Sequence, residues 1–301
     1  MPVRKKLCYD IAMLKAIIKT MRPKQWTKNI FLFAALVFDR QLTNPEALLQ
    51  TILGFFLFSF LSSTVYIIND IADKEADRKH PKKMNRPIAS GQLSVKVAAV
   101  VAVVIVVITL TLSYLLSPAF MLISLVYFIT FLCYSFELKH VPIIDVMIIA
   151  AGFVMRVAAG VSLIQVERFS PWLYVVTTLL ALYIGFGKRR AELMLLNDDA
   201  NSHRPVLDGY SIPFLDTLIT IVSSTTIMAY SLYTFSAPNL PNNHAMMLTI
   251  PFVIYGIFRY LFLIQMQGEG GAPDELVLSD RPLQLTGILY GLSVLFIFYI
   301  F

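Results

Sequence analysis

The sequence predicts an all-α integral membrane protein, a polytopic bundle of about nine transmembrane helices. Of its 301 residues, 57% are hydrophobic and 15% are charged, whereas about one quarter of the residues of a soluble domain are charged. The apolar residues gather in runs of about 20, the length that an α-helix needs to cross a bilayer. The cationic residues flank these runs, so membrane lipids, and not a nucleic acid, are the expected partners of the net charge of +6.

The helices follow from the runs in chain order. Residues 1–26 form a basic arm without an apolar core and cleavage site, so no removable signal peptide is expected. A short run at 27–38 follows, which on length alone could be a re-entrant or interfacial helix. The long runs then lie at 47–68, 94–116, 119–136, 142–164, 171–187, 212–235, 246–266 and 283–301.

Charge asymmetry favours counting the short run as a span. With nine spans and a cytoplasmic N-terminus, nearly all Lys and Arg residues outside the spans lie on the cytoplasmic side, as the positive-inside rule requires. With eight spans, the basic arm would lie outside. We therefore expect a multi-pass protein of the cell (inner) membrane. Residues 27–301 should form one helical domain, with the loops 69–93 and 188–211 as a cytoplasmic cap.

Three aspartates follow the run at 47–68. If the helix continues, Asp70, Asp73 and Asp77 share one face and spread over about 10 Å. Carboxylates gathered at a membrane boundary repel one another unless a cation lies among them, and Mg²⁺ shared with phosphate oxygens is the natural candidate. We predict that these three residues are catalytic and bind the metal. The basic run behind them, with Lys82 and Arg86, either holds phosphate oxygens or is only a topogenic loop.

A second basic cluster opens the loop at 188–211. Lys188, Arg189 and Arg190, with Glu192 one turn on, form either a second anion-binding rim or a stop-transfer cluster. Arg156 lies within a span, where a cation is expensive, and is either a cavity ligand or the partner of a carboxylate. Other candidates for substrate binding are Lys28, Asn69 and Arg204.

Other catalytic classes lack support in the sequence. The four histidines show no metal-ligand spacing, and no nucleophile elbow, P-loop or dinucleotide fingerprint occurs. The two cysteines, Cys8 and Cys133, imply neither a disulfide framework nor a metal site.

The aspartate motif resembles that of a known family. Asn69-Asp70-x-x-Asp73-x-x-x-Asp77, followed by Asn85-Arg86-Pro87-Ile88-Ala89-Ser90-Gly91, is similar to the first Asp-rich segment of the UbiA superfamily of intramembrane prenyltransferases. In that family this loop binds Mg²⁺ and a prenyl diphosphate, and a second Asp-rich motif follows the sixth span. Here Gly187-Lys188-Arg189-Arg190-Ala191-Glu192 takes that place. This segment and residues 22–29, 138–142 and 204–207 together resemble one branch of the family, the phosphoribosyltransferases that act on decaprenyl phosphate.

The resemblance implies a Mg²⁺-dependent transferase that moves 5-phosphoribose from PRPP to a polyprenyl (decaprenyl) phosphate and releases diphosphate, for cell wall biogenesis. It adds Lys139 to the substrate-binding candidates. A basic rim suits PRPP, which carries a 5-phosphate besides its diphosphate. Two alternatives stay open: a prenyltransferase acting on an aromatic or other small acceptor, and a lipid-binding or transport protein without turnover. A homo-oligomer also stays open.

Overall fold

The computed structural model describes residues 2–80, 83–164, 170–196, 205–238, 240–241, 243–267, 276–277 and 279–300. Over these ranges the regular secondary structure is entirely helical, which confirms the predicted fold class. The chain divides into two compact units. The first comprises Met1–Leu36, Asn44–Lys139 and Met155–Gln165, and the second comprises Val37–Thr43, His140–Val154 and Val166–Phe301.

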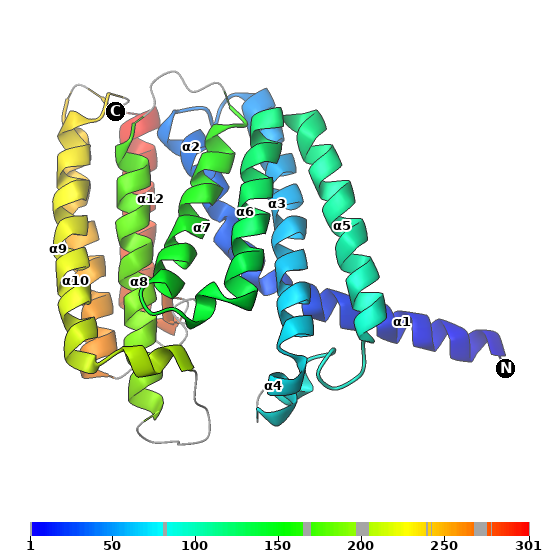
Figure 1. Ribbon diagram of the computed structural model, residues 1–301. Helices are drawn as coiled ribbons and strands as arrows, with labels where there is room; N and C mark the ends of the chain where they lie inside the picture. The colour runs from blue at the N-terminus through cyan, green and yellow to red at the C-terminus, as the bar shows by residue number, and fades with distance from the viewer. Residues whose placement is uncertain are drawn as a thin grey trace. The chain divides into compact units, whose positions relative to one another are not determined.

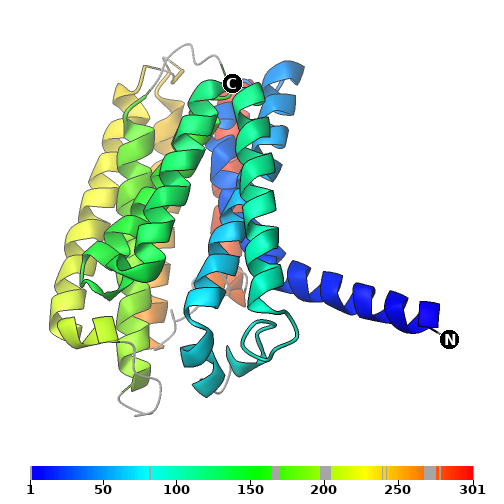
Figure 2. The same ribbon diagram turned by 45° about the vertical axis from the view of Figure 1, so that its right-hand side comes forward.

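The helices in chain order, with 3₁₀ helices marked η, are α1 (Pro2–Met21), η1 (Pro23–Leu32), α2 (Phe33–Phe38), α3 (Pro45–Ala72), α4 (Lys74–Lys79), η2 (Lys83–Asn85), α5 (Val95–Leu116), α6 (Pro118–Phe136), η3 (Leu138–His140), α7 (Ile144–Val161), α8 (Trp172–Leu196), η4 (Pro205–Gly209), α9 (Ile212–Ser236), η5 (Ala245–Thr249), α10 (Ile250–Met266) and α12 (Arg281–Tyr299). In the first unit α3 packs against both α5 and α6, and α1 runs at a steep angle to α3 and α5 in two views (Figures 1 and 2). In the second unit α8 packs against α9, and α10 packs against α12.

Local sequence explains where several of these helices begin. The Asn44 side chain accepts hydrogen bonds from the backbone N–H groups of Glu46 and Ala47, and Pro45 occupies the first turn of α3. Ser94, Ser117 and Asp280 cap α5, α6 and α12 in the same way. These side chains satisfy backbone donors that have no partner within the helix, which fixes the point where each helix starts.

Seven helical segments of the described chain are long and apolar enough to cross a membrane: α3, α5, α6, α7, η5 with α10 (Ala245–Met266), α9 and α12. The helix α8 is not among them, and its last nine residues include three cations and Glu192. The predicted run at 27–38 consists of the end of η1 and the short helix α2. The count of nine spans therefore stays a prediction.

Close packing holds η1 inside the first unit. A Cβ atom built on Gly160 of α7 would lie 2.0 Å from the carbonyl oxygen of Leu32, so only glycine allows this approach. Leu32 is fully buried with Phe58 of α3 and Phe120 of α6. The end of η1 is thereby packed against α3, α6 and α7 in the unit that carries the aspartate motif.

Candidate functional site

The aspartate motif lies where α3 ends and α4 begins. Asp70 is in the last turn of α3, Asp73 is the single residue between the two helices, and Asp77 is in α4. The backbone N–H groups of Asp73 and Asp77 donate to the carbonyl oxygens four residues earlier, at 2.9 and 2.8 Å. These hydrogen bonds keep the spacing of a helix, but the continuous helix on which the prediction of one shared face depends is interrupted at Asp73.

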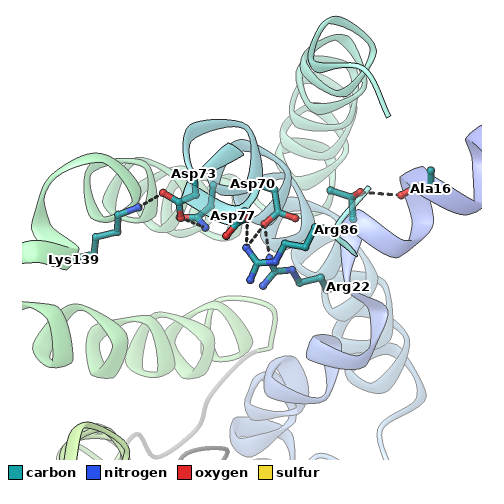
Figure 3. Close-up of polar contacts among 9 residues, drawn as sticks. Ala16, Arg22, Asp70, Asp73, Asp77, Arg86 and Lys139 are labelled. Atoms are coloured by element: carbon teal, nitrogen blue, oxygen red, sulfur yellow. Dashed lines mark hydrogen bonds and ion pairs between the residues drawn. The ribbon is translucent and has the colours of Figure 1, made fainter. Parts of the chain in front are cut away.

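Asp70 and Asp77 are buried and share one cation (Figure 3). The Arg86 Nη1 atom lies 2.6 Å from Asp77 Oδ2 and 3.1 Å from Asp70 Oδ1. A second guanidinium, that of Arg22, donates to Asp70 Oδ1 at 2.5 Å and stacks over the Tyr66 ring. Two carboxylates at 2–3% exposure thus converge on the same positively charged group.

Asp73 has different partners. Its Oδ1 atom accepts a hydrogen bond from Lys139 Nζ at 2.7 Å, and its Oδ2 atom accepts one from the Asn69 amide at 3.0 Å (Figure 3). Its side chain is 32% exposed, against 2–4% for the side chains of Asp70 and Asp77. Asp73 is therefore the carboxylate of the motif that a substrate can reach most readily.

Cations of the chain match the negative charges of the motif. Three carboxylates, those of Asp70, Asp73 and Asp77, face three cations, those of Arg22, Arg86 and Lys139. Over the described residues, no three Asp, Glu, His or Cys side chains are gathered closely enough to hold a metal ion.

Burial lowers the pKa of His80, which follows α4, and the nearby positive charge of Lys83 lowers it further.

Arg156 is the centre of a buried network in the first unit. Its Nε atom donates to Asn29 Oδ1 at 2.8 Å and its Nη2 atom donates to the Tyr127 hydroxyl at 2.9 Å. The Asn29 amide in turn donates to Ser59 and Ser62 of α3. This network ties α7 and α6 to η1 and α3. The groups that these contacts supply are neutral, and not the carboxylate that one of the two predicted roles required.

The second basic cluster is folded into the second unit instead of forming an open rim. The Arg189 side chain is 2% exposed, and its Nε atom lies 2.6 Å from Asp145 Oδ2 while its Nη1 atom lies 2.5 Å from Glu192 Oε2. Arg190 pairs with Asp216 and donates to the carbonyl oxygen of Ile264. These arginines were predicted to form either an anion-binding rim or a stop-transfer cluster. Their side chains are 2% and 9% exposed, against 29% and 25% for Arg22 and Arg86, and they pair with carboxylates inside the unit.

A tyrosine completes the Arg189 cluster. The Tyr210 hydroxyl donates to Asp145 Oδ1 at 2.7 Å and accepts from the backbone N–H of Ile143. Burial raises the pKa of Tyr210, and the hydrogen bond to the Asp145 carboxylate raises it further, so the phenol stays protonated and keeps donating. Arg189, Asp145 and Tyr210 therefore fasten α8, α7 and the segment before α9 to one another.

Several site residues were missed or are not described. Arg22, Asp145, Tyr210 and Asp216 were not predicted as site residues, although Arg22 stands in the segment 22–29 on which the family resemblance partly rests. The predicted residues Lys28 and Lys188 are half-buried in η1 and α8. Lys82 and Arg204 lie outside the described residues.

Known proteins resemble this chain over almost its whole length. It is 33% identical to the decaprenyl-phosphate phosphoribosyltransferase of Corynebacterium glutamicum, over 94% of this chain and 87% of that protein. It is 31% identical to the protein of the same name from Mycobacterium tuberculosis, over 94% of each. A solved UbiA homologue from Archaeoglobus fulgidus, bound to GPP and Mg²⁺, shares the fold with a TM-score of 0.71 at 21% identity, over 94% of this chain and 98% of that one.

The match to a family confirms the resemblance that the aspartate motif suggests. Residues 30–273 match the model of the UbiA prenyltransferase family. With its apolar helices, the chain is an integral membrane protein, and it belongs to the UbiA prenyltransferase family.

Proposed function

We propose that this protein is a polyprenyl-phosphate phosphoribosyltransferase, which moves 5-phosphoribose from PRPP to a polyprenyl phosphate such as decaprenyl phosphate and releases diphosphate. The observation that carries the proposal is the similarity, over 94% of the chain, to two relatives named for this transfer. The distribution of Lys and Arg supports a cell-membrane location with the aspartate motif on the cytoplasmic side.

The donor set of the site fits Mg²⁺. Asp70 and Asp77 already direct one oxygen each at a single positively charged nitrogen of Arg86, so their geometry suits a cation between them. Hard carboxylate oxygens are the ligands that Mg²⁺ prefers. Asp70 and Asp77 would hold the ion as the chain is arranged here, and Asp73 would join them only by leaving Lys139 and Asn69. A bound Mg²⁺ would neutralise the charge of the departing diphosphate.

The cations of the site have a second use when PRPP enters. Arg22, Arg86 and Lys139 donate to carboxylates in the structure, and the same donors can bind phosphate oxygens with comparable strength. Lys139 and Arg86 are the predicted phosphate ligands that contact the motif directly. We assign a structural role, holding helices together, to Arg189, Arg190 and Glu192. The other predicted substrate ligands stay proposals: Lys28, Asn69, Lys82, Arg156, Lys188 and Arg204.

The reaction needs little proton chemistry. The bond between ribose C1 and the diphosphate oxygen breaks with its electron pair on diphosphate, and an oxygen of the lipid phosphate bonds to C1 from the opposite face. That oxygen is anionic at neutral pH, so no strong general base is required. What the protein supplies is position and charge: cations at the leaving group and a site that holds both phosphates.

The proposal is tested with purified protein in detergent, labelled PRPP, a polyprenyl phosphate and Mg²⁺, by extracting the lipid and measuring diphosphate. The expected product is a labelled lipid that disappears with EDTA. Asp73→Asn should nearly abolish it, whereas Glu75→Gln should not, because the Glu75 side chain is 74% exposed and pairs with its neighbours Lys74 and Arg78. Undiminished transfer by Asp73→Asn would contradict the site, and the absence of a labelled lipid with the unaltered protein would contradict the function.

A further inference from the structure

The helix α1 has an apolar face that the described residues of the first unit leave exposed. From Ile11 onward, where its side chains are described, one face of α1 packs into a cluster through Met13, Ala16 and Ile17. A second face exposes Ile11, Leu14 and Ile18, which are 46%, 57% and 47% exposed. These residues are spaced i, i+3 and i+7 and form one stripe along the helix.

Cations border this stripe. Lys15 and Lys19 are both exposed and follow the apolar residues around the helix, each directly after a stripe residue, Leu14 or Ile18, in sequence. Three faces thus run along one helix: a core face, an apolar face and a cationic edge. This pattern is typical of helices that lie in the plane of a membrane interface.

The neighbours of α1 place it at the level of that interface. The helix α1 contacts α3. Its core face shares one hydrophobic cluster with Ile67 and Ile71 in the last turns of α3, and with Leu93 and Val95 where α5 begins. Both points lie beside the aspartate motif, where the apolar part of α3 ends. Figures 1 and 2 show α1 at a steep angle to these helices and extending beyond α5.

We propose that α1 lies in the headgroup region of an anionic bilayer. The Ile11–Leu14–Ile18 stripe enters the boundary of the acyl chains, and Lys15 and Lys19 bind lipid phosphates. We identify lipid as the partner of this exposed face because the apolar stripe and the cationic edge lie next to each other. The helix also lies at the ends of two spans, at their membrane boundary. An anionic interface offers both chemistries, acyl chains and phosphates, at that depth.

The membrane contact is connected to the aspartate site at two points. The Lys19 ammonium donates to the backbone carbonyl of Asn85 in the loop that follows α4, at 3.2 Å. One residue after α1 ends, Arg22 adopts a left-handed conformation with a φ of 52° and donates to Asp70. A helix fixed to the lipid surface would therefore hold Arg22 and the Asn85 loop in place.

The test is a depth measurement on the full chain in vesicles. Cys8 and Cys133 are replaced with serine, and a nitroxide is attached through Leu14→Cys or, as the water-exposed control, through Glu75→Cys. Accessibility to oxygen, which concentrates in the acyl region, is compared with accessibility to a polar nickel complex. We expect an oxygen-to-nickel ratio several-fold higher at position 14 than at position 75, in variants that elute and melt like the unlabelled protein. Ile18→Cys repeats the measurement if Leu14→Cys fails to fold.

The charge of the lipid provides the second arm. Adding phosphatidylglycerol to phosphatidylcholine vesicles should raise the ratio at the labelled stripe, and Lys15→Gln should reduce this increase. The matched control is Lys79→Gln, which removes an exposed cation from α4 and should leave the increase unchanged. A ratio at position 14 equal to that at position 75 would overturn the proposal. So would magnetic coupling between labels on two molecules, which would show that a second copy of the chain covers the stripe.

Discussion

Asp145→Asn is expected to destabilise the second unit, because the carboxylate of Asp145 is the buried counter-charge of Arg189. Asp145 is 0% exposed and the Arg189 side chain is 2% exposed, with 2.6 Å between Oδ2 and Nε. Removing one partner of such a pair costs about 3–5 kcal/mol, because the other charge stays buried. Glu192 still contacts Arg189, and asparagine keeps an oxygen that can accept one hydrogen bond. The expected loss is therefore nearer the ~1.5–3 kcal/mol of a hydrogen bond to a charged group.

The assay is urea denaturation in detergent, with transfer activity measured on the same samples below the transition. Asp145→Ala should lose more stability than Asp145→Asn, and Glu192→Gln should lose less, because the Glu192 side chain is 24% exposed. Replacing both partners, as Asp145→Leu with Arg189→Met, should recover much of the loss, since a buried pair exchanged for apolar side chains is often neutral.

One result would refute this reasoning. If Asp145→Asn unfolds at the same urea concentration as the unaltered protein, while Arg189→Met stays stable but raises KM for PRPP, then Arg189 binds a phosphate and the pair does not hold the helices together.

Three further predictions concern other parts of the molecule. Arg86→Met should lower kcat/KM for phosphoribosyl transfer at least about tenfold, the effect of losing ~1.4 kcal/mol of transition-state stabilisation, and the lysine variant should retain part of the rate. Gly160→Ala should lower the free energy of unfolding in urea by about 1–3 kcal/mol, because its Cβ would overlap a backbone oxygen. Gly287→Ala places its Cβ in open space and should leave that free energy unchanged or raise it. The hydrogen bond from Arg259 lowers the pKa of Asp280, so this pair should stabilise the protein fully above pH ~4, the usual pKa of aspartate, and lose that effect as the pH falls further. Asp280→Asn should remove this part of the acid dependence of the melting temperature, and an unchanged dependence would exclude the pair as its source.

The long helices could be predicted because their cause is local. Runs of apolar residues with capping side chains, such as Asn44 before α3 and Ser117 before α6, determine a helix wherever it packs. The 3₁₀ helix η1 could not be predicted, because distant residues hold it. Trp26 donates to Ser63 of α3, and Asn29 accepts a hydrogen bond from Arg156 of α7. Neither contact can be recognised from the order of apolar and polar residues around η1.

The aspartate motif was predictable as a cluster but its partners were not. Asp70, Asp73 and Asp77 stand at helical spacing that can be seen in the sequence. Their cations come from far away: Arg22 is 48 residues from Asp70, and Lys139 is 66 residues from Asp73. The arginines after Gly187 were predicted to form an anion-binding rim or a stop-transfer cluster. Their burial depends on Asp145 and Asp216, which lie on other helices.

The most direct test of the central claim offers the protein two donors at once. Purified protein with Mg²⁺ receives PRPP and a polyprenyl phosphate, together with a prenyl diphosphate and an aromatic acid, and the lipid products are identified by mass spectrometry. The account predicts a polyprenyl phosphate heavier by one phosphoribosyl group, with diphosphate released in equal amount and no prenylated acid. A prenylated acid without the phosphoribosyl lipid would contradict it and would identify the protein as a transferase of prenyl groups.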